Sequence, residues 1–186
     1  FNSQNEVAKG GNVSTNYIEI AEILAEAGVD LIIAEMMRDF ENAKMIIKAA
    51  LLTGLPLWIG YSAMHTNKGN HIMSWRWKNS LPPVNFSKLV SDIVPLGGEA
   101  AGIMHSQVRD TGPALEILAK KWKGPKLAYA ETGTLEKPEW SFKEIFEPKE
   151  YSENIINWIE KFGVQIVGGC CGTGPEHISV LKEKIP

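Results

Sequence analysis

Apolar residues recur along the chain in two patterns that follow one another. In the first, they stand three and four positions apart, as in an amphipathic helix, over residues 15–27, 39–53, 86–97, 111–124, 149–163 and 174–185. The second is a short continuous apolar run, typical of a buried strand, over residues 29–36, 55–62, 99–106, 125–132 and 164–169. The chain is therefore predicted to alternate helices with strands.

This order of elements predicts an α/β fold in which helices cover a parallel sheet. Two architectures fit it: an open, doubly wound sheet and part of a (β/α)8 barrel. In both, functional side chains lie at the carboxyl ends of the strands. The polar segments 64–84 and 133–149 are predicted loops, and no repeat or linker divides the chain. Residues 1–186 are therefore expected to form a single domain.

The composition narrows the class of protein. Hydrophobic residues make up 44% of the chain and charged residues 22%, which is ordinary for a globular protein with a buried core. A net charge of −3 with scattered lysines predicts neither a nucleic-acid nor a membrane partner, and no apolar run approaches the roughly 20 residues of a membrane span. Two cysteines make no disulfide framework, so a cytoplasmic, reducing location is expected. Because the chain begins with Phe1 rather than methionine, we expect it to be part of a longer protein.

Polar and reactive side chains stand at the predicted strand ends. They are Glu35 after the first strand, then Tyr61, Ser62 and His65, then Met104 and His105, then Tyr129, Glu131 and Thr132, and finally Cys170 and Cys171. If the strands are parallel neighbours, these side chains converge on one rim of the sheet. The rim is therefore the predicted functional site.

Cys170 and Cys171 are adjacent, and glycines flank them on both sides. Together with the imidazole of His105 they suit a catalytic zinc ion, which takes three protein ligands and leaves a fourth position open. Consecutive strand residues point to opposite faces, so both thiols can bind one ion only if the backbone leaves strand geometry, which glycine permits. Thr173 and Glu176 have capping-box spacing for the last helix, whose positive end would favour thiolates.

Other interpretations of these residues remain open. The two cysteines can be ordinary core residues, and His105 can be a hydrogen-bonded histidine without a metal. The glycine-rich loop 168–174 can hold an anion on its backbone N–H groups, as an open flavodoxin-like domain would. His177, on the last helix, is expected to face away from the site.

Several stretches resemble the homocysteine S-methyltransferase family, which includes betaine-, S-methylmethionine- and folate-dependent methyltransferases. VGGCCGTGPEHI resembles the C-terminal signature of the family, and LAEAGVDLIIAEMMRDFENA resembles the stretch that contains its strand-end glutamate, here Glu35. EAAGIMHS stands where the family has Gly-Val-Asn-Cys, and PKLAYAETG where it has Tyr-Pro-Asn-Ser/Ala-Gly. The resemblance covers roughly residues 15–180.

The resemblance implies a (β/α)8 barrel with one catalytic zinc ion on its rim. The family holds zinc with three cysteines, two of which correspond to Cys170 and Cys171, while His105 stands at the third position. In the family, zinc binds the homocysteine sulfur as a thiolate, which attacks the methyl carbon of a donor and gives methionine. By the same resemblance Glu35, with Cys170 and Cys171, belongs to the catalytic set, and the expected substrate-binding residues are Glu35, Tyr129, Glu131 and Thr132.

The sequence also departs from the family pattern. Histidine replaces the third cysteine, which leaves less negative charge around the ion, and Ala130 and Glu131 replace the proline and asparagine. About five of the eight β/α units of a barrel are present, so the predicted barrel is incomplete and lacks its N-terminal strands. A homo-dimer that buries the open sheet edges is one expectation. The alternative function is that of a catalytically inactive or metal-free homologue that acts as a binding or assembly subunit. The resemblance does not identify the methyl donor.

Overall fold

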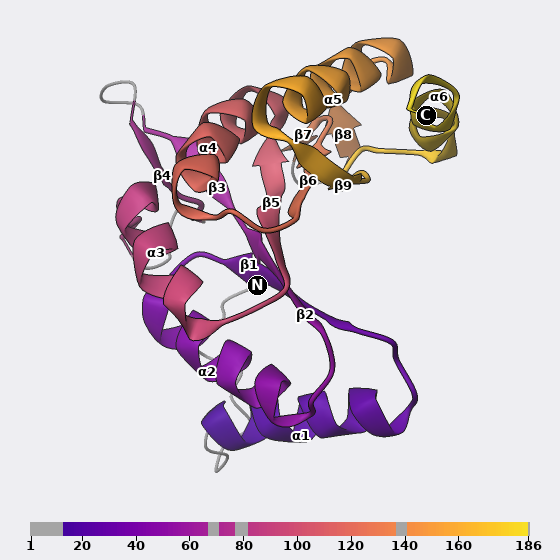
Figure 1. Ribbon diagram of the computed structural model, residues 1–186. Coiled ribbons are helices and arrows are strands. Elements are labelled where there is room, and N and C mark those ends of the chain that lie inside the picture. Colours follow the sequence, from indigo (N-terminus) through magenta and orange to yellow (C-terminus); the bar gives the residue numbers. More distant parts are fainter. Residues whose placement is uncertain (1–12, 67–70, 77–81, 137–140, 186) are drawn as a thin grey trace.

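The computed structural model describes residues 13–66, 71–76, 82–136 and 141–185. Helices and strands alternate as predicted (Figure 1). Their bounds are α1 Val13–Glu26, β1 Ile32–Met37, α2 Phe40–Leu52, β2 Leu57–Tyr61, β3 Ala63–His65, β4 Ile72–Ser74, α3 Phe86–Ile93, the 3-10 helix η1 Val94–Leu96, β5 Ala100–Gln107, α4 Val108–Lys121, β6 Lys126–Glu131, β7 Thr134–Glu136, β8 Ser141–Lys143, α5 Pro148–Phe162, β9 Val164–Val167 and α6 Pro175–Lys184.

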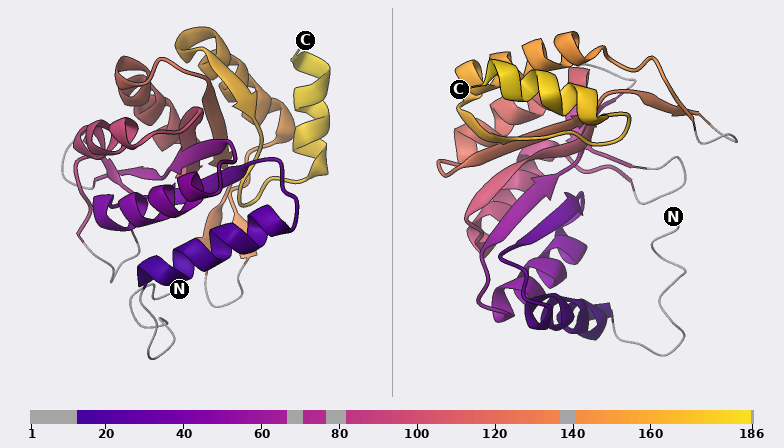
Figure 2. Two further views of the ribbon diagram at one scale, coloured as in Figure 1. Left: turned by 60° about the horizontal axis from the view of Figure 1, so that its bottom comes forward. Right: turned by 90° about the vertical axis from the view of Figure 1, so that its right-hand side faces the viewer.

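Five strands form one parallel sheet in the order β1-β2-β5-β6-β9, which is also their order along the chain. A doubly wound sheet instead reverses its strand order at a switch point, so that alternative is wrong. Each helix packs against the next, from α1 to α6, and together they form a layer around the outer side of the sheet (Figure 2). The α/β fold with a parallel sheet is confirmed, while closure into a barrel stays a prediction because β1 and β9 form the edges of the described sheet.

Alternation along the strands separates the two faces of the sheet. One face packs into the main hydrophobic cluster, and small residues there let the helices approach closely; this set contains Ala34, Ile59, Ala101, Ile103 and Ala128 from the strands and Ile47, Leu115, Leu118 and Ile155 from the helices. The other face carries Ile33 and Glu35 of β1, both exposed. The strand ends are thus anchored by the helix layer. On the other face the edge strand β1 is exposed, while Met104 of β5 and Leu127 of β6 are buried.

Gly102 lies at a close approach between β5 and β6. It is paired with Gly60 of β2 on one side and with Leu127 of β6 on the other. A Cβ atom at Gly102 would overlap the backbone carbonyl of Leu127. The spacing of the two strands that flank the rim site therefore depends on this glycine.

Two antiparallel hairpins interrupt the segments that were predicted as loops. One pairs β3 with β4 after β2, and the other pairs β7 with β8 after β6. Each strand has three residues, which is too short to produce a periodic pattern in the sequence. Both hairpins follow a strand of the main sheet, so they rise beside the predicted rim.

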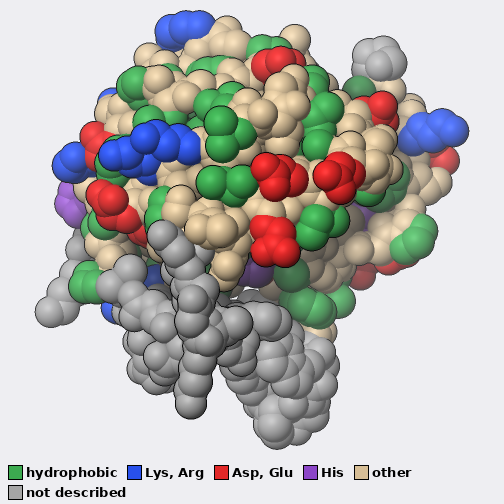
Figure 3. All heavy atoms as spheres, turned by 90° about the horizontal axis from the view of Figure 1, so that it is seen from below, with side chains coloured by type: hydrophobic (Ala, Val, Ile, Leu, Met, Phe, Trp, Pro, Cys, Tyr) green, Lys and Arg blue, Asp and Glu red, His purple; other side chains and the backbone are tan. Residues whose placement is uncertain are grey.

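Helix α1, seen from below in Figure 3, exposes apolar side chains next to acidic ones. Ile20, Ile23 and Leu24 are exposed apolar residues of this helix. The expected homo-dimer stays a prediction.

None of the described helices is both long and apolar enough to cross a membrane.

Candidate metal centre

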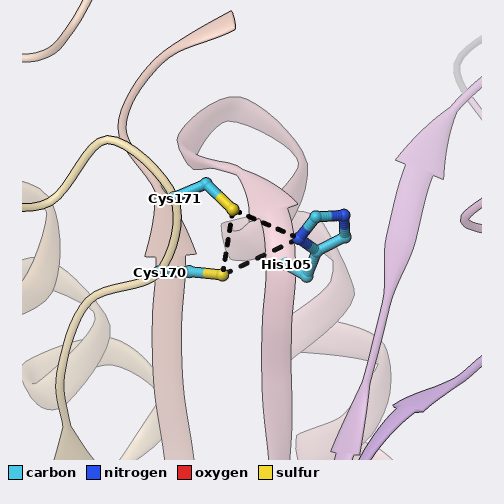
Figure 4. Close-up of side chains that lie close together, drawn as sticks. All are labelled: His105, Cys170 and Cys171. Carbon is cyan, nitrogen blue, oxygen red and sulfur yellow. Dashed lines mark hydrogen bonds between the residues drawn. The ribbon is translucent and has the colours of Figure 1, made fainter. Parts of the chain in front are cut away.

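His105 lies near the end of β5, where the backbone departs from regular strand geometry. The pairing of β5 with β6 shifts between Met104 and Gln107, and His105 has a φ of +41°. Residues other than glycine seldom adopt this left-handed region, and such conformations concentrate at functional sites. The irregularity turns the imidazole toward the end of β9 (Figure 4).

The segment after β9 continues beside β6 without being a strand. The Gly168 N–H donates to the Ala128 carbonyl at 3.2 Å, and the Cys170 N–H donates to the Ala130 carbonyl at 3.1 Å. These two bonds carry the chain along β6 past the end of β9 at Val167. Cys170 is thereby brought to the same height as the end of β5.

A tight turn then brings Cys171 beside Cys170. The Thr173 N–H donates to the Cys170 carbonyl at 3.1 Å, and Gly172 has a φ of +79°, which glycine adopts without strain. The Thr132 N–H donates to the Cys171 carbonyl at 2.9 Å and ties the turn to the end of β6. The backbone leaves strand geometry here, as binding of one ion by both thiols requires.

The three donor atoms form a nearly equilateral triangle (Figure 4). The Nδ1 atom of His105 lies 3.7 Å from the Cys170 Sγ atom and 3.8 Å from the Cys171 Sγ atom, and the two sulfur atoms are 3.9 Å apart. Tetrahedral zinc places two sulfur ligands about 3.8 Å apart and a sulfur and a nitrogen ligand about 3.6 Å apart, given its usual bond lengths. The triangle therefore fits one face of a zinc tetrahedron, and the structure brings together the three predicted ligands.

Burial sets the charge state of the donors. It lowers the pKa of His105, as does the nearby Arg38, while Glu35 acts in the opposite direction. The imidazole is therefore kept neutral, which is the form that binds metals. Burial also raises the pKa of Cys170 to about 12, with a further contribution from the charge of Cys171. Binding of an ion must therefore release a proton from Cys170.

Aromatic and charged side chains surround the triangle. The indole of Trp75 stands edge-on to the His105 ring, with centroids 4.9 Å apart, and the Arg38 guanidinium lies 5.9 Å from the Trp75 ring centroid. On the face of the sheet opposite the helices, the Tyr129 hydroxyl donates to the Glu35 carboxylate at 3.0 Å. Burial and the Glu35 charge raise the pKa of Tyr129, so it remains a hydrogen-bond donor at neutral pH. Glu35 is thus a fixed carboxylate that is close enough to influence His105.

Glu131 and Thr132, two predicted substrate-binding residues, lie at the end of β6 in different surroundings. Glu131 lines a cavity of about 430 Å³ together with Gln107, Arg109 and Glu144. Thr132 is buried, and its N–H group donates to the Cys171 carbonyl. Thr132 therefore supports the cysteine turn, and contact of either residue with a substrate stays a prediction.

Other residues at the strand ends contact groups outside the triangle. Tyr61 is buried and packs on Phe86, and the Ser62 hydroxyl contacts the Met104 sulfur at 3.3 Å. The imidazole of His65 pairs with the Asp110 carboxylate at 2.5 Å. Strand-end position alone therefore selects more residues than the three donor residues that converge.

The cap of α6 differs from the prediction by one residue. The N-cap is Gly174 rather than Thr173, and the side chain that accepts from its N–H group belongs to His177 rather than Glu176. His177 is buried, and its ring contacts Phe146 and Tyr151 rather than the triangle. The sequence contained a weak signal for this role, because His177 is the third residue of the helix, where a capping acceptor stands.

Stability is expected to depend on pH through Glu131. Burial, with the charge of Asp110, raises the pKa of Glu131 from 4.5 to about 7. The folded protein then binds more protons between these values than the unfolded one, so stability is full below pH 4.5 and is lost as pH rises through 7. The loss is about 2 kcal/mol after allowance for solvent screening. Glu131→Gln is therefore expected to exceed wild type by about 2 kcal/mol at pH 8 and to match it at pH 4.

Urea unfolding at both pH values measures this difference. Glu144→Gln is the matched control, because Glu144 lines the same cavity but is exposed. Equal stability of wild type and Glu131→Gln at pH 8 would contradict the prediction.

The comparisons with known proteins identify the family of the chain. The homocysteine S-methyltransferase family model matches residues 8–185. The chain belongs to the homocysteine S-methyltransferase family.

The chain matches part of the length of several longer relatives. The homocysteine S-methyltransferase YbgG of Bacillus subtilis is 29% identical over 164 residues, which are 85% of this chain and 47% of that protein. The methionine synthase of Mycobacterium leprae is 26% identical over 167 residues, which are 87% of this chain and 13% of that protein. The crystal structure of the Escherichia coli homocysteine methyltransferase MmuM in its metallated form superposes with a TM-score of 0.65 at 19% identity, over 92% of this chain and 52% of that one. The chain thus spans about half the length of YbgG and MmuM, and the structural likeness supports the fold.

Proposed function

We propose that the chain carries the zinc centre of an S-methyltransferase that transfers a methyl group to the thiol of homocysteine and gives methionine. The observation that carries the proposal is the triangle of His105, Cys170 and Cys171, whose edges of 3.7, 3.8 and 3.9 Å fit a single ion with an open position. Family membership supports the reaction class, and the names of YbgG and MmuM support homocysteine as the acceptor.

The donor set favours zinc among the metals. Two thiolates and one imidazole are borderline-soft ligands, and tetrahedral sites of mixed sulfur and nitrogen are typical of zinc. When bound, zinc would stabilise a substrate thiol as its thiolate at neutral pH and fix its position. A neutral His105 in place of a third thiolate leaves one negative charge fewer around the ion. The alternative of a metal-free binding subunit is not favoured, because the three donor atoms converge.

Residues outside the triangle are proposed to orient the substrate. We expect the ammonium group of homocysteine to bind the exposed Glu35 carboxylate, which accepts a hydrogen bond from the Tyr129 hydroxyl at 3.0 Å. In the methyl transfer the thiolate sulfur forms a bond to the methyl carbon while the bond from that carbon to the donor breaks, and the electron pair leaves with the donor. Orientation of the thiolate for this in-line attack is the main contribution that the rim can make.

Binding of homocysteine to the zinc-loaded chain tests the proposal. Calorimetry is expected to detect homocysteine binding with zinc present and none after a chelator removes it. Homoserine, which has a hydroxyl in place of the thiol, is expected not to bind. Glu35→Gln is expected to weaken binding about 10-fold, the size of one charge-assisted hydrogen bond.

Glu41→Gln is the control for Glu35→Gln, since Glu41 is an exposed carboxylate in the first turn of α2. Homocysteine that binds equally well with and without zinc would overturn the proposed role of the metal. Equal binding of homoserine would overturn the proposed role of the thiol.

A further inference from the structure

Both ring nitrogens of the buried His177 have hydrogen-bond partners. The Gly174 N–H group donates to Nδ1 at 3.1 Å, and Nε2 lies 2.8 Å from the Phe146 carbonyl oxygen. Because an amide N–H only donates and a carbonyl only accepts, Nδ1 must be unprotonated and Nε2 must carry the hydrogen. The carboxylate of Glu176, 3.4 Å from Nδ1, therefore receives no hydrogen from that atom. The ring is held as one neutral tautomer.

These bonds continue to the metal-binding turn. The Phe146 N–H donates to the Thr132 carbonyl at 2.8 Å, and the Thr132 N–H donates to the Cys171 carbonyl at 2.9 Å. Gly174 follows Cys171 by three residues along the chain. Cys171, Thr132, Phe146, His177 and Gly174 thus form a closed circuit, here called the His177 circuit.

The other end of the cysteine segment has a brace of its own. The Tyr151 hydroxyl donates to the Gly168 carbonyl at 2.8 Å, and the Tyr151 ring stands edge-on to the His177 ring with centroids 5.8 Å apart. The segment from Gly168 to Gly174 is therefore held at one end by Tyr151 and at the other by His177. Between these two points lie both thiols of the triangle.

We infer that His177 is a positioning residue for the metal centre. Through the His177 circuit it holds Cys170 and Cys171 in the geometry that binds the ion. The inference rests on the proposed function. It follows from the geometry because the turn has no strand or helix of its own to stabilise it, so its shape depends on these bonds. Loss of the ring would leave the Gly174 N–H and the Phe146 carbonyl without their partners.

Three variants separate positioning from mere packing of α6. His177→Leu removes both hydrogen bonds but fills the buried space with an apolar side chain. His177→Gln retains a hydrogen-bond acceptor and a donor on one side chain. Leu181→Ala removes a buried contact of the same helix without touching the circuit. Zinc affinity, measured by competition with a chelator, is expected to fall 10- to 100-fold in His177→Leu, as is typical of residues that orient ligands. His177→Gln is expected to recover most of the loss, and Leu181→Ala to retain the wild-type affinity.

Amide hydrogen exchange of the metal-free protein gives a second, independent result. The N–H groups of Thr132 and Phe146 are expected to exchange at least about 10-fold faster in His177→Leu than in Leu181→Ala, because only the first variant opens the circuit. Equal exchange in the two variants, or an equal loss of zinc affinity, would overturn the inference. Wild-type protein that binds no zinc would instead overturn the proposed function, and the exchange rates would still decide whether His177 holds the turn.

Discussion

Replacement of Cys170 by serine is expected to lower the zinc affinity of the chain by about 100- to 1000-fold. Four-ligand zinc sites gain about 10–16 kcal/mol, or about 2.5–4 kcal/mol for each ligand, which corresponds to two to three powers of ten in affinity. The loss of the imidazole in His105→Ala is expected to be of similar size. Serine fills nearly the same space as cysteine, so the fold should persist while the soft ligand is lost.

Elemental analysis of protein purified without added metal, followed by chelator competition, measures both effects. Near one zinc ion per chain is expected in wild type and far less in either variant. His71→Ala is the matched control for His105→Ala, because His71 is exposed and is not one of the three converging donors. Full zinc content in His105→Ala would remove the imidazole from the ligand set, and wild type without zinc would refute the metal centre.

The sequence predicted the composition of this site better than its geometry. Convergence of His105, Cys170 and Cys171 follows from the parallel order of the strands, which places all carboxyl ends on one rim. The glycines around the cysteines indicated that the backbone would turn there. The φ of +41° at His105 had no such signal, because a histidine in this conformation is imposed by its surroundings rather than by its own preference.

The fold shows the same division between regular and irregular features. Long periodic segments gave the helices and the sheet within a few residues, since burial of one face requires that pattern. The hairpins β3–β4 and β7–β8 were predicted as loops, because three-residue strands carry no period. The observed N-cap of α6 lies one residue after the predicted one. The reason is that the buried side chain of His177, which contacts the Phe146 carbonyl, takes the place of the usual acidic acceptor. The features that could not be predicted were therefore either too short to carry a period or, as at His177, dependent on contacts between segments that are distant in sequence.

The spacing of β5 and β6 leads to the second large effect. Gly102→Ala is expected to lower the free energy of unfolding by about 3 kcal/mol, the upper range for overpacking of a buried site. The new Cβ atom would overlap the backbone carbonyl of Leu127, and a strand held in the middle of a sheet cannot move away as a side chain can. Such a loss is a large fraction of the roughly 5–15 kcal/mol that stabilises a typical domain.

The measurement is urea unfolding of metal-free protein, with Gly168→Ala as the control. A Cβ atom at Gly168 would meet the Tyr129 side chain at an ordinary 3.6 Å, so this variant is expected to stay within about 1 kcal/mol of wild type. Stability of Gly102→Ala equal to that of the control would contradict the close approach of the two strands. His105 follows Gly102 by three residues on β5. Any displacement of β5 that relieves the overlap must therefore also move the imidazole away from the two thiols, and the zinc affinity of Gly102→Ala is expected to fall together with its stability.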